Sequence, residues 1–313
     1  MDNPIFIVGL PRSGSTLWAK ILEKNKNILR FREMFFLRPW GKDFRYFYRK
    51  KVGDLSIENN ITKMIELIFS GEKIAGINGT FWEDMGKIND NDLKDKIHNK
   101  ILNSDKSLEN IFKIIIEETT KFKGYKRCFV KFPVYFSYIP KLLEWYPQCK
   151  VIHITRDPRA IAISKTNDPG GTQKLIKKYS QINHISYFIK KIMIFFVIFQ
   201  YIWDSKVHNK CKKFQNYALF RYEDLLNNPE KTILELCEFS KIKFNKRMLY
   251  PDEGEESSLT GKKRKGFDKK AAFRWKNVIS PLEKKIVTFF TKNSMKRFGY
   301  DPIYHPIFWD DLD

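Results

Sequence analysis

Residues 5–17 read IFIVGLPRSGSTL, and this stretch decides the fold. Its apolar run predicts a strand, Gly9 and Gly14 bracket a turn, and the residues from Ser15 onward predict a helix. Backbone N–H groups at a helix start have no internal partners, and the helix dipole adds positive charge there. We therefore expect the turn to bind a phosphate or sulfate group.

The cation of this turn is Arg12. The glycine spacing matches the P-loop of nucleotide triphosphatases, but Ser15 stands where that motif has lysine. The positive charge thus lies inside the loop, close to a single anionic group, rather than along the β- and γ-phosphates of a triphosphate. This argues against ATP, and a strand, turn and helix without any ligand remain the simpler interpretation of the segment alone.

Short apolar runs alternate with helical periodicity along the chain. This predicts an α/β fold with a P-loop-like, three-layer arrangement, in which helices flank a mostly parallel central sheet. The expected strands are residues 5–8, 28–31, 127–131, 151–155 and 217–220. The expected helices are residues 15–24, 56–69, 108–122, 138–146, 158–165, about 187–211, 229–240 and 281–298. Asp157, Asn228 and Ser280 each precede a proline and are expected as N-caps.

The 313 residues contain no repeat and no Pro- or Ser-rich linker, so we expect a single domain over residues 1–313. The polar residues 87–95 and 251–270 are the expected mobile insertions. The net charge of +22 suits nucleic acid, an anionic polysaccharide, a membrane surface or an anionic cofactor. Since no RNA-binding signature, zinc-finger spacing or heptad repeat accompanies the charge, we expect no nucleic-acid partner.

The four cysteines are expected to be reduced packing residues. Cys128, Cys149, Cys211 and Cys237 lie in or beside apolar segments and show no metal-ligand spacing. We therefore expect no metal site.

The apolar residues 192–203 run for only twelve positions between Lys191 and Asp204. We expect a helix buried on most sides rather than a transmembrane segment, with an interfacial helix as the lesser alternative. The first strand begins almost at Met1, so no secretory signal is expected before it. A cytoplasmic location follows as an expectation.

Four charged residues follow predicted strands: Arg12, Glu33, Lys131 and Arg156. Ligands of parallel α/β sheets gather at the carboxyl ends of the strands, so three cations and one carboxylate are expected on one edge. Taken singly, Lys131 could be a solvated strand end, Glu33 a surface carboxylate, and Arg156 a partner of Asp157. Together they favour an anion-binding site.

Two motifs resemble the sulfotransferases that use 3′-phosphoadenosine-5′-phosphosulfate (PAPS). GLPRSGSTLW is similar to the 5′-phosphosulfate loop of that family, and VIHITRDPRAIAISK to its 3′-phosphate motif. The resemblance implies that the 5′ end is held by Pro11, Arg12, Ser13, Gly14, Ser15 and Thr16. It implies that Arg156 and Ser164 hold the ribose 3′-phosphate. An arginine at a strand end and a serine two helical turns later can reach one phosphate.

Further matches extend the similarity along the chain. Residues 221–225 (RYEDL) resemble a segment that follows a late strand in these enzymes, and the pattern from Arg274 to Tyr300 resembles the C-terminal part of their bacterial and tyrosylprotein-type branches. The tripeptide Arg264, Lys265 and Gly266 is similar to the loop that closes over the 3′-phosphate in cytosolic members. A short basic tripeptide also arises by chance in a lysine-rich region.

The resemblance also suggests the catalytic groups, which are Arg12, Glu33 and Lys131. The segment after Lys131 lacks the histidine that serves as base in cytosolic members. Glu33, in the segment REMFFL, resembles the glutamate that follows the phosphosulfate loop in the tyrosylprotein and bacterial branches, which makes it the candidate base, and Lys131 matches the second cation of those branches. The implied reaction is an in-line displacement at sulfur, in which Glu33 takes the proton of an acceptor hydroxyl and the two cations neutralise sulfuryl oxygens. It needs no metal.

The implied function is transfer of a sulfuryl group from PAPS to a hydroxyl acceptor, with adenosine 3′,5′-bisphosphate (PAP) as product. The basic composition favours a glycan acceptor, ahead of peptidyl tyrosine or a lipid-like alcohol. Insertions at about residues 40–105 and 168–212 would shape the acceptor site. The aromatic residues that could either stack on sugars or pack in the core are Trp40, Phe44, Tyr46, Phe81 and Trp82. A P-loop nucleotide or small-molecule kinase and a noncatalytic polyanion-binding protein remain alternatives, and the oligomeric state is open.

Overall fold

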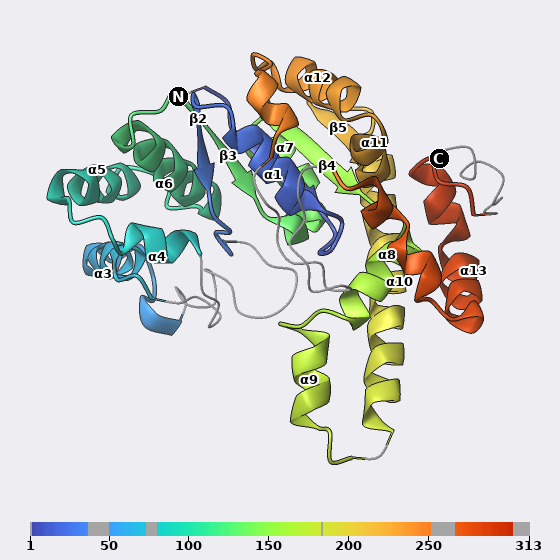
Figure 1. Ribbon diagram of the computed structural model, residues 1–313. Coiled ribbons are helices and arrows are strands. Elements are labelled where there is room, and N and C mark those ends of the chain that lie inside the picture. Colours follow the sequence, from blue (N-terminus) through green and yellow to red (C-terminus); the bar gives the residue numbers. More distant parts are fainter. Residues whose placement is uncertain (1, 37–49, 73–79, 183, 252–266, 303–313) are drawn as a thin grey trace.

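A parallel five-stranded sheet lies at the centre of the computed structural model (Figure 1), which describes residues 2–36, 50–72, 80–182, 184–251 and 267–302. The strands are β1 (Ile5–Gly9), β2 (Ile28–Phe31), β3 (Arg127–Lys131), β4 (Lys150–Thr155) and β5 (Tyr217–Arg221). All five sequence-predicted strands are confirmed to within one residue at each end. Their spatial order is β2-β3-β1-β4-β5, and every neighbouring pair is parallel.

This order creates a topological switch point between β1 and β4. The chain leaves β1 toward β2 on one side of the sheet and leaves β4 toward β5 on the other. The two connections therefore diverge at the carboxyl ends of these adjacent strands, which is where ligands bind in open α/β sheets.

Helices cover both faces of the sheet. They are α1 (Ser15–Glu23), α3 (Glu58–Phe69), α4 (Phe81–Met85), α5 (Asn91–Leu102), α6 (Leu108–Phe122), α7 (Ile139–Trp145), α8 (Pro158–Thr166), α9 (Thr172–Lys178), α10 (Ile185–Cys211), α11 (Tyr222–Asn227), α12 (Pro229–Ser240) and α13 (Pro281–Arg297). The described residues also contain 3₁₀ segments at Pro133–Tyr138, Lys246–Leu249, Lys269–Ala272 and Arg274–Asn277. The eight predicted helices are all present, which confirms the three-layer α/β class.

The core is divided by the sheet. Phe6 and Val8 of β1 pack in the larger cluster, with residues of α6, α7 and α10, while Ile5 and Ile7 point to the opposite cluster, with α1 and α12. Because both faces of a parallel sheet are covered, its strands are continuous apolar runs rather than alternating ones. All five residues of β1 are buried accordingly.

Helix starts follow the predicted capping chemistry at two of three sites. The Asp157 carboxylate accepts from the Arg159 N–H at the start of α8, and Ser280 forms a reciprocal capping box with Glu283 at the start of α13. Asn228 precedes α12 as predicted, but its side chain makes no cap hydrogen bond.

The expected mobile run at residues 87–95 is partly wrong, since α5 occupies its second half. Asp90 caps α5 by accepting from the Leu93 N–H at 2.7 Å, and Leu93, Ile97 and Ile101 bury one helical stripe. Only three apolar residues in a polar segment carry that periodicity, so the overall polarity concealed it. The other expected mobile run overlaps residues 252–266, which lie outside the described residues.

The four cysteines are buried and unpaired, as predicted. Burial raises the pKa of the Cys128 and Cys149 thiols to about 12 and that of Cys211 and Cys237 to about 11. Such thiols stay neutral near pH 7, which fits packing residues rather than nucleophiles.

The prediction that residues 192–203 form a helix buried on most sides is wrong. They belong to α10, which is 27 residues long, and only about a third of its most apolar stretch is buried. By length and composition α10 is the one described helix that could cross a membrane, because it extends well beyond the twelve-residue run. Figure 1 shows why so much of it is exposed: α9 and the first half of α10 project from the body of the protein.

Candidate active site at the strand ends

The loop between β1 and α1 requires both of its glycines. Gly9 has φ 146° and a Cβ there would lie 2.2 Å from the carbonyl oxygen of Ile154 on the adjacent strand. Gly14 has φ 92° and a Cβ there would lie 2.3 Å from the Tyr222 ring. Only glycine accommodates this combination of positive φ and close approach, so the loop is held tightly against β4 and α11.

The loop presents features of an anion site. Among the described residues no side chain makes a cap hydrogen bond at the start of α1, so no side-chain oxygen occupies the N–H groups of its first turn. Ser13 is fully buried, and its hydroxyl has no hydrogen-bond partner among the described residues. A buried hydroxyl without a partner is costly, and an anionic oxygen seated in the loop would satisfy it. The residues present therefore fit a bound sulfate or phosphate group.

Arg12, Arg156 and Ser164 meet at the switch point. Arg12 adopts φ 77°, and its Nε donates to the Ser164 hydroxyl on α8 at 3.0 Å. Arg156, just beyond β4, donates from Nη1 to the Arg12 carbonyl oxygen at 3.3 Å and from Nη2 to the Ala271 carbonyl oxygen at 3.0 Å. The sequence motifs that suggest the 5′ and 3′ ends of one nucleotide are thus in direct contact.

Arg156 is positioned by its surroundings and is not the partner of Asp157. Its guanidinium carbon lies 4.5 Å from the centre of the Tyr222 ring. Asp157 pairs instead with Arg159, whose Nη2 is 2.6 Å from the carboxylate. Arg156 is 6% exposed, and its Nε is buried without a partner among the described residues. This second unsatisfied donor at the switch point again fits an anionic ligand.

Glu33 and Lys131 form an ion pair on the same edge of the sheet. The Lys131 ammonium is 2.7 Å from the Glu33 carboxylate, with the two side chains 12% and 33% exposed. Lys131 ends β3 in register with Ile7, and Glu33 follows β2, whose Phe31 is in register with Val130. The Glu33 carbonyl also accepts from the Phe81 N–H at 3.2 Å, which fixes the chain beyond β2. The edge therefore places a proton acceptor beside a cation.

Two carboxylates near these residues were not predicted as part of the site. Asp168 lies 3.9 Å from Arg12 and 3.7 Å from Lys165. Glu223 accepts from the Tyr300 hydroxyl at 2.6 Å and from the Asp157 N–H at 3.1 Å, and burial raises its pKa. The resemblance of residues 221–225 singled out Glu223 but predicted no hydrogen-bond partner for it. No sequence signal indicated that Asp168 would approach Arg12.

Six of the expected residues lie outside the described part of the chain, and two aromatic residues are buried in the core. Arg264, Lys265 and Gly266, and likewise Trp40, Phe44 and Tyr46, lie outside the described residues. Phe81 and Trp82 are each 1% exposed, and the Trp82 indole donates to the Met34 carbonyl. They pack in the core, so their alternative role as sugar-stacking platforms is wrong. Within the described ranges no group of three or more His, Cys, Asp and Glu side chains is placed to hold a metal ion.

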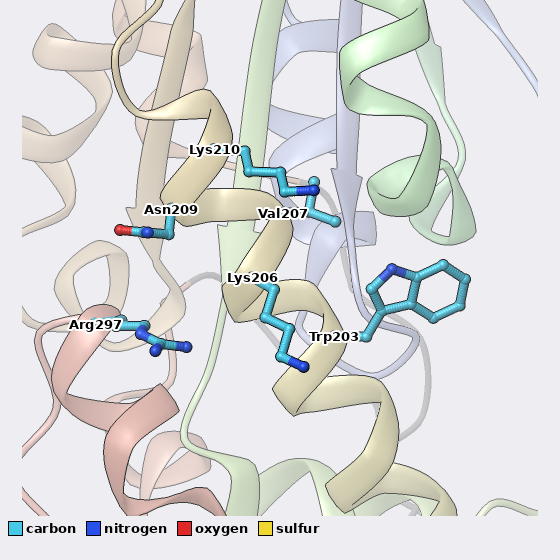
Figure 2. Close-up of a pocket in the computed structure, with 6 residues that line it drawn as sticks. All are labelled: Trp203, Lys206, Val207, Asn209, Lys210 and Arg297. Atoms are coloured by element: carbon cyan, nitrogen blue, oxygen red, sulfur yellow. The ribbon is translucent and has the colours of Figure 1, made fainter.

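A separate pocket of about 350 Å³ lies between α10 and α13 (Figure 2). Its lining residues are Trp203, Lys206, Val207, Asn209, Lys210 and Arg297. It contains three basic side chains and no carboxylate, and none of its lining residues belongs to the strand-end site.

Comparison with known proteins gives a consistent family assignment. Residues 4–246 match the model of the sulfotransferase family. Among curated proteins, an uncharacterized protein of Aquifex aeolicus (strain VF5) is 23% identical over 253 residues, which are 79% of this chain and 26% of that protein. The chain thus spans about a quarter of the length of the curated relative it matches.

Solved structures share the fold. The sulfotransferase domain of the Synechococcus PCC 7002 olefin synthase superposes with a TM-score of 0.57 at 19% identity, covering 96% of this chain and 95% of that one. The sulfotransferase domain from the curacin biosynthetic pathway gives 0.57 at 17% identity, covering 96% and 99%. Sulfotransferase STF9 from Mycobacterium avium gives 0.51 at 10% identity, covering 96% and 77%.

Proposed function

This chain belongs to the sulfotransferase family, and from that premise we propose that it transfers a sulfuryl group from PAPS to a hydroxyl acceptor. The contact between Arg12 and Ser164, with Arg156 donating to the Arg12 carbonyl, carries the proposal. It joins the loop suited to a sulfated 5′ end to the residues suited to a 3′-phosphate. A nucleotide with anionic groups at both positions would bridge them.

The donor half of the site consists of Arg12, Ser13, Arg156, Ser164 and the loop N–H groups. PAPS, when bound, supplies the sulfuryl group and a leaving phosphate. Arg12 and the uncapped first turn of α1 would hold the 5′ end. The unpartnered Nε of Arg156 and the hydroxyl of Ser164 would hold the 3′-phosphate. The resemblance also assigns Arg264, Lys265 and Gly266 to that phosphate, and this assignment stays a prediction because these three lie outside the described residues.

The acceptor half consists of Glu33 and Lys131. Glu33 would take the proton of the attacking hydroxyl, and Lys131, 2.7 Å away, would neutralise charge on the sulfuryl and bridging oxygens together with Arg12. The side chains present supply the base and the cations, so the proposal includes no metal.

A glycan hydroxyl is the proposed acceptor, supported by the net charge of +22, which would attract anionic sugars. We propose that residues 1–313 form one catalytic domain in which about residues 40–105 and 168–212 shape the acceptor site. Incubation with labelled PAPS and a panel of glycans, tyrosine peptides and lipid-like alcohols tests the acceptor class. Labelling of peptides or alcohols alone would contradict the glycan proposal. The cytoplasmic location stays a prediction.

Ligand stabilisation tests the donor and separates the three functions considered. A ligand that binds the native state raises the thermal midpoint in proportion to its occupancy. We expect PAP to raise the midpoint by several degrees, ATP with magnesium to have little effect, and heparin to act only at low salt. Stabilisation by ATP with magnesium alone would favour a kinase, and stabilisation by heparin alone would favour a polyanion-binding protein.

A further inference from the structure

Helix α10 is apolar on two opposite sides. One side packs into the protein through Ile194, Val197, Tyr201 and His208, all at most 7% exposed. The other side carries Phe188, Ile192, Phe195 and Phe199, which are 56%, 60%, 51% and 59% exposed. Their spacing of i, i+4, i+7 and i+11 places these four side chains in one stripe along the helix. An apolar stripe that faces water on a helix already packed by its other face needs its own explanation.

Helix α13 widens this stripe. Phe289 and Phe290 are 64% and 50% exposed, and the ring centre of Phe290 lies 6.2 Å from that of Phe195. We call these six residues the outer aromatic face: Phe188, Ile192, Phe195, Phe199, Phe289 and Phe290. Contiguous exposed apolar surface of this kind marks an interaction site rather than scattered surface residues.

Positive charge surrounds the outer aromatic face. Residues 169–203 contain five lysines and neither aspartate nor glutamate. The Lys191 ammonium lies 4.1 Å from the Tyr187 ring centre, and the Lys292 ammonium lies 5.6 Å from that of Phe289. Lysines beside aromatic rings can place their stems along an apolar surface and their ammonium groups in water.

The stripe continues into the basic pocket of Figure 2. Lys206 and Lys210 lie 7 and 11 residues after Phe199, which is the same spacing, and together with Arg297 of α13 they line a space of about 350 Å³. Trp203 lies between the aromatic and basic parts. Basic side chains therefore border the apolar stripe at both ends, with Lys190 and Lys191 near its start and Lys206 and Lys210 after Trp203, as in helices that lie in the interface of a bilayer.

We propose that the outer aromatic face docks this protein on the surface of an anionic lipid bilayer, with Lys206, Lys210 and Arg297 at the level of the lipid phosphates. A second copy of the chain is a poorer occupant, because two such faces would bring lysines against lysines. The helix binds without crossing, because the opposite side of its second half is packed against the core through Tyr201 and the 1% exposed Asp204. The inference goes beyond sulfuryl transfer and does not depend on it.

Vesicle flotation tests the docking surface on the full chain. We expect the wild type to float with vesicles of equimolar phosphatidylcholine and phosphatidylglycerol, and to bind phosphatidylcholine alone at least about tenfold more weakly, since each lysine near an anionic surface adds attraction. The double variant Phe195→Ser/Phe199→Ser is expected to lower the partition coefficient about a hundredfold, because two phenylalanines lose their burial in lipid.

The matched control is Ile57→Ser/Phe122→Ser, which removes two apolar side chains that are 56% and 42% exposed elsewhere on the molecule. It is expected to float as the wild type does. A second variant, Lys206→Gln/Lys210→Gln, is expected to reduce the preference for anionic vesicles about tenfold. The substituted residues of both variants lie at exposed positions. The thermal midpoint of each variant verifies that it is folded.

Three results would overturn the proposal. The first is no flotation of the wild type with anionic vesicles, which would leave an acidic protein as the better partner. The second is unchanged flotation of Phe195→Ser/Phe199→Ser. The third is a dimer in sedimentation velocity that this variant converts to a monomer, which would make the face an interface between copies. Calorimetry with PAP is independent of all three, so failure here leaves the proposed transfer reaction untouched.

Discussion

The two halves of the strand-end site hold their charges in different ways. In the donor half, Arg156 donates to two main-chain carbonyls and stacks on Tyr222, and Arg12 donates to the Ser164 hydroxyl. In the acceptor half, Glu33 and Lys131 are held mainly by each other, and the segment 37–49 beyond Glu33 lies outside the described residues. The donor half is thus fixed by the fold, whereas the acceptor half is a single ion pair.

This difference separates binding from chemistry. Contacts to backbone carbonyls and a ring cost no reorganisation when a ligand enters, so the donor half is suited to tight, pre-organised binding. An ion pair between a carboxylate and an ammonium can exchange partners, which suits groups that move a proton and neutralise charge. Substitutions of Arg156 and of Glu33 should therefore change different kinetic constants, whereas Arg12, which the proposal places at the sulfuryl group, should act on turnover although it belongs to the donor half.

Glu33→Gln is the change with the largest expected effect. The amide keeps an oxygen that can accept from Lys131 but cannot take a proton, so kcat is expected to fall about a thousandfold. The dissociation constant of PAP by calorimetry should stay within about twofold. Glu23→Gln, an exposed glutamate paired with Arg30, is the matched control. Full turnover by Glu33→Gln would show that the base is elsewhere and remove the acceptor half as defined.

Arg12→Ala should lower kcat about a hundredfold, since loss of one pre-organised oxyanion donor costs about 3 kcal/mol. Alanine bears the same backbone strain as arginine at φ 77°, so the substitution mainly measures the loss of the Arg12 side chain. Arg12→Lys should recover part of the loss because it restores the charge but not the planar fork. Equal activity of Arg12→Ala and wild type in single-turnover assays would remove Arg12 from the chemistry.

Arg156→Ala should act on affinity rather than turnover. Loss of a charge-assisted contact to phosphate is expected to raise the dissociation constant of PAP on the order of tenfold to a hundredfold. Turnover at saturating donor should remain within about threefold, because the proposal assigns Arg156 to the 3′-phosphate and not to the reacting sulfuryl group. Arg247→Ala, on an exposed 3₁₀ segment, controls for the loss of one positive charge. A large fall in turnover with unchanged affinity would reverse the roles of the two halves.

His208→Gln should affect neither half and change only the pH dependence of stability. His208 Nδ1 lies 2.8 Å from the Tyr217 hydroxyl, and burial lowers the pKa of His208 to about 4. The unfolded chain takes up the proton near pH 6.5, so this contribution to stability is complete above that pH and is lost as the pH falls toward 4.

The wild type should therefore lose about 2 kcal/mol from this histidine between about pH 7.5 and about pH 5. His208→Gln lacks that contribution. Its free energy of unfolding in urea should therefore differ between the two pH values by about 2 kcal/mol less than that of the wild type. An identical pH difference in both proteins would show that His208 titrates normally when folded. Turnover and PAP affinity at neutral pH should equal those of the wild type.

Local sequence signals predicted most of the frame and part of the site. Apolar runs bounded by glycine or proline marked every strand, because a strand covered on both faces has no polar residues to alternate with. The same runs indicate which charged residues follow strand ends, so the sequence alone predicts Arg12, Glu33, Lys131 and Arg156. Helix α5 was missed because only Leu93, Ile97 and Ile101 carry its periodicity in a polar segment.

The sequence by itself determined the strand and helix positions, the glycine-bracketed loop and the residues at the strand ends, since these depend on backbone preferences and on burial over a few neighbouring positions. Only the tertiary structure decided which groups become partners. It pairs Asp157 with Arg159, joins Arg12 to Ser164 over 152 positions, and exposes one apolar side of α10 while burying the other. Such contacts join segments distant in sequence, and the order of the strands, rather than any local pattern, brings those segments together.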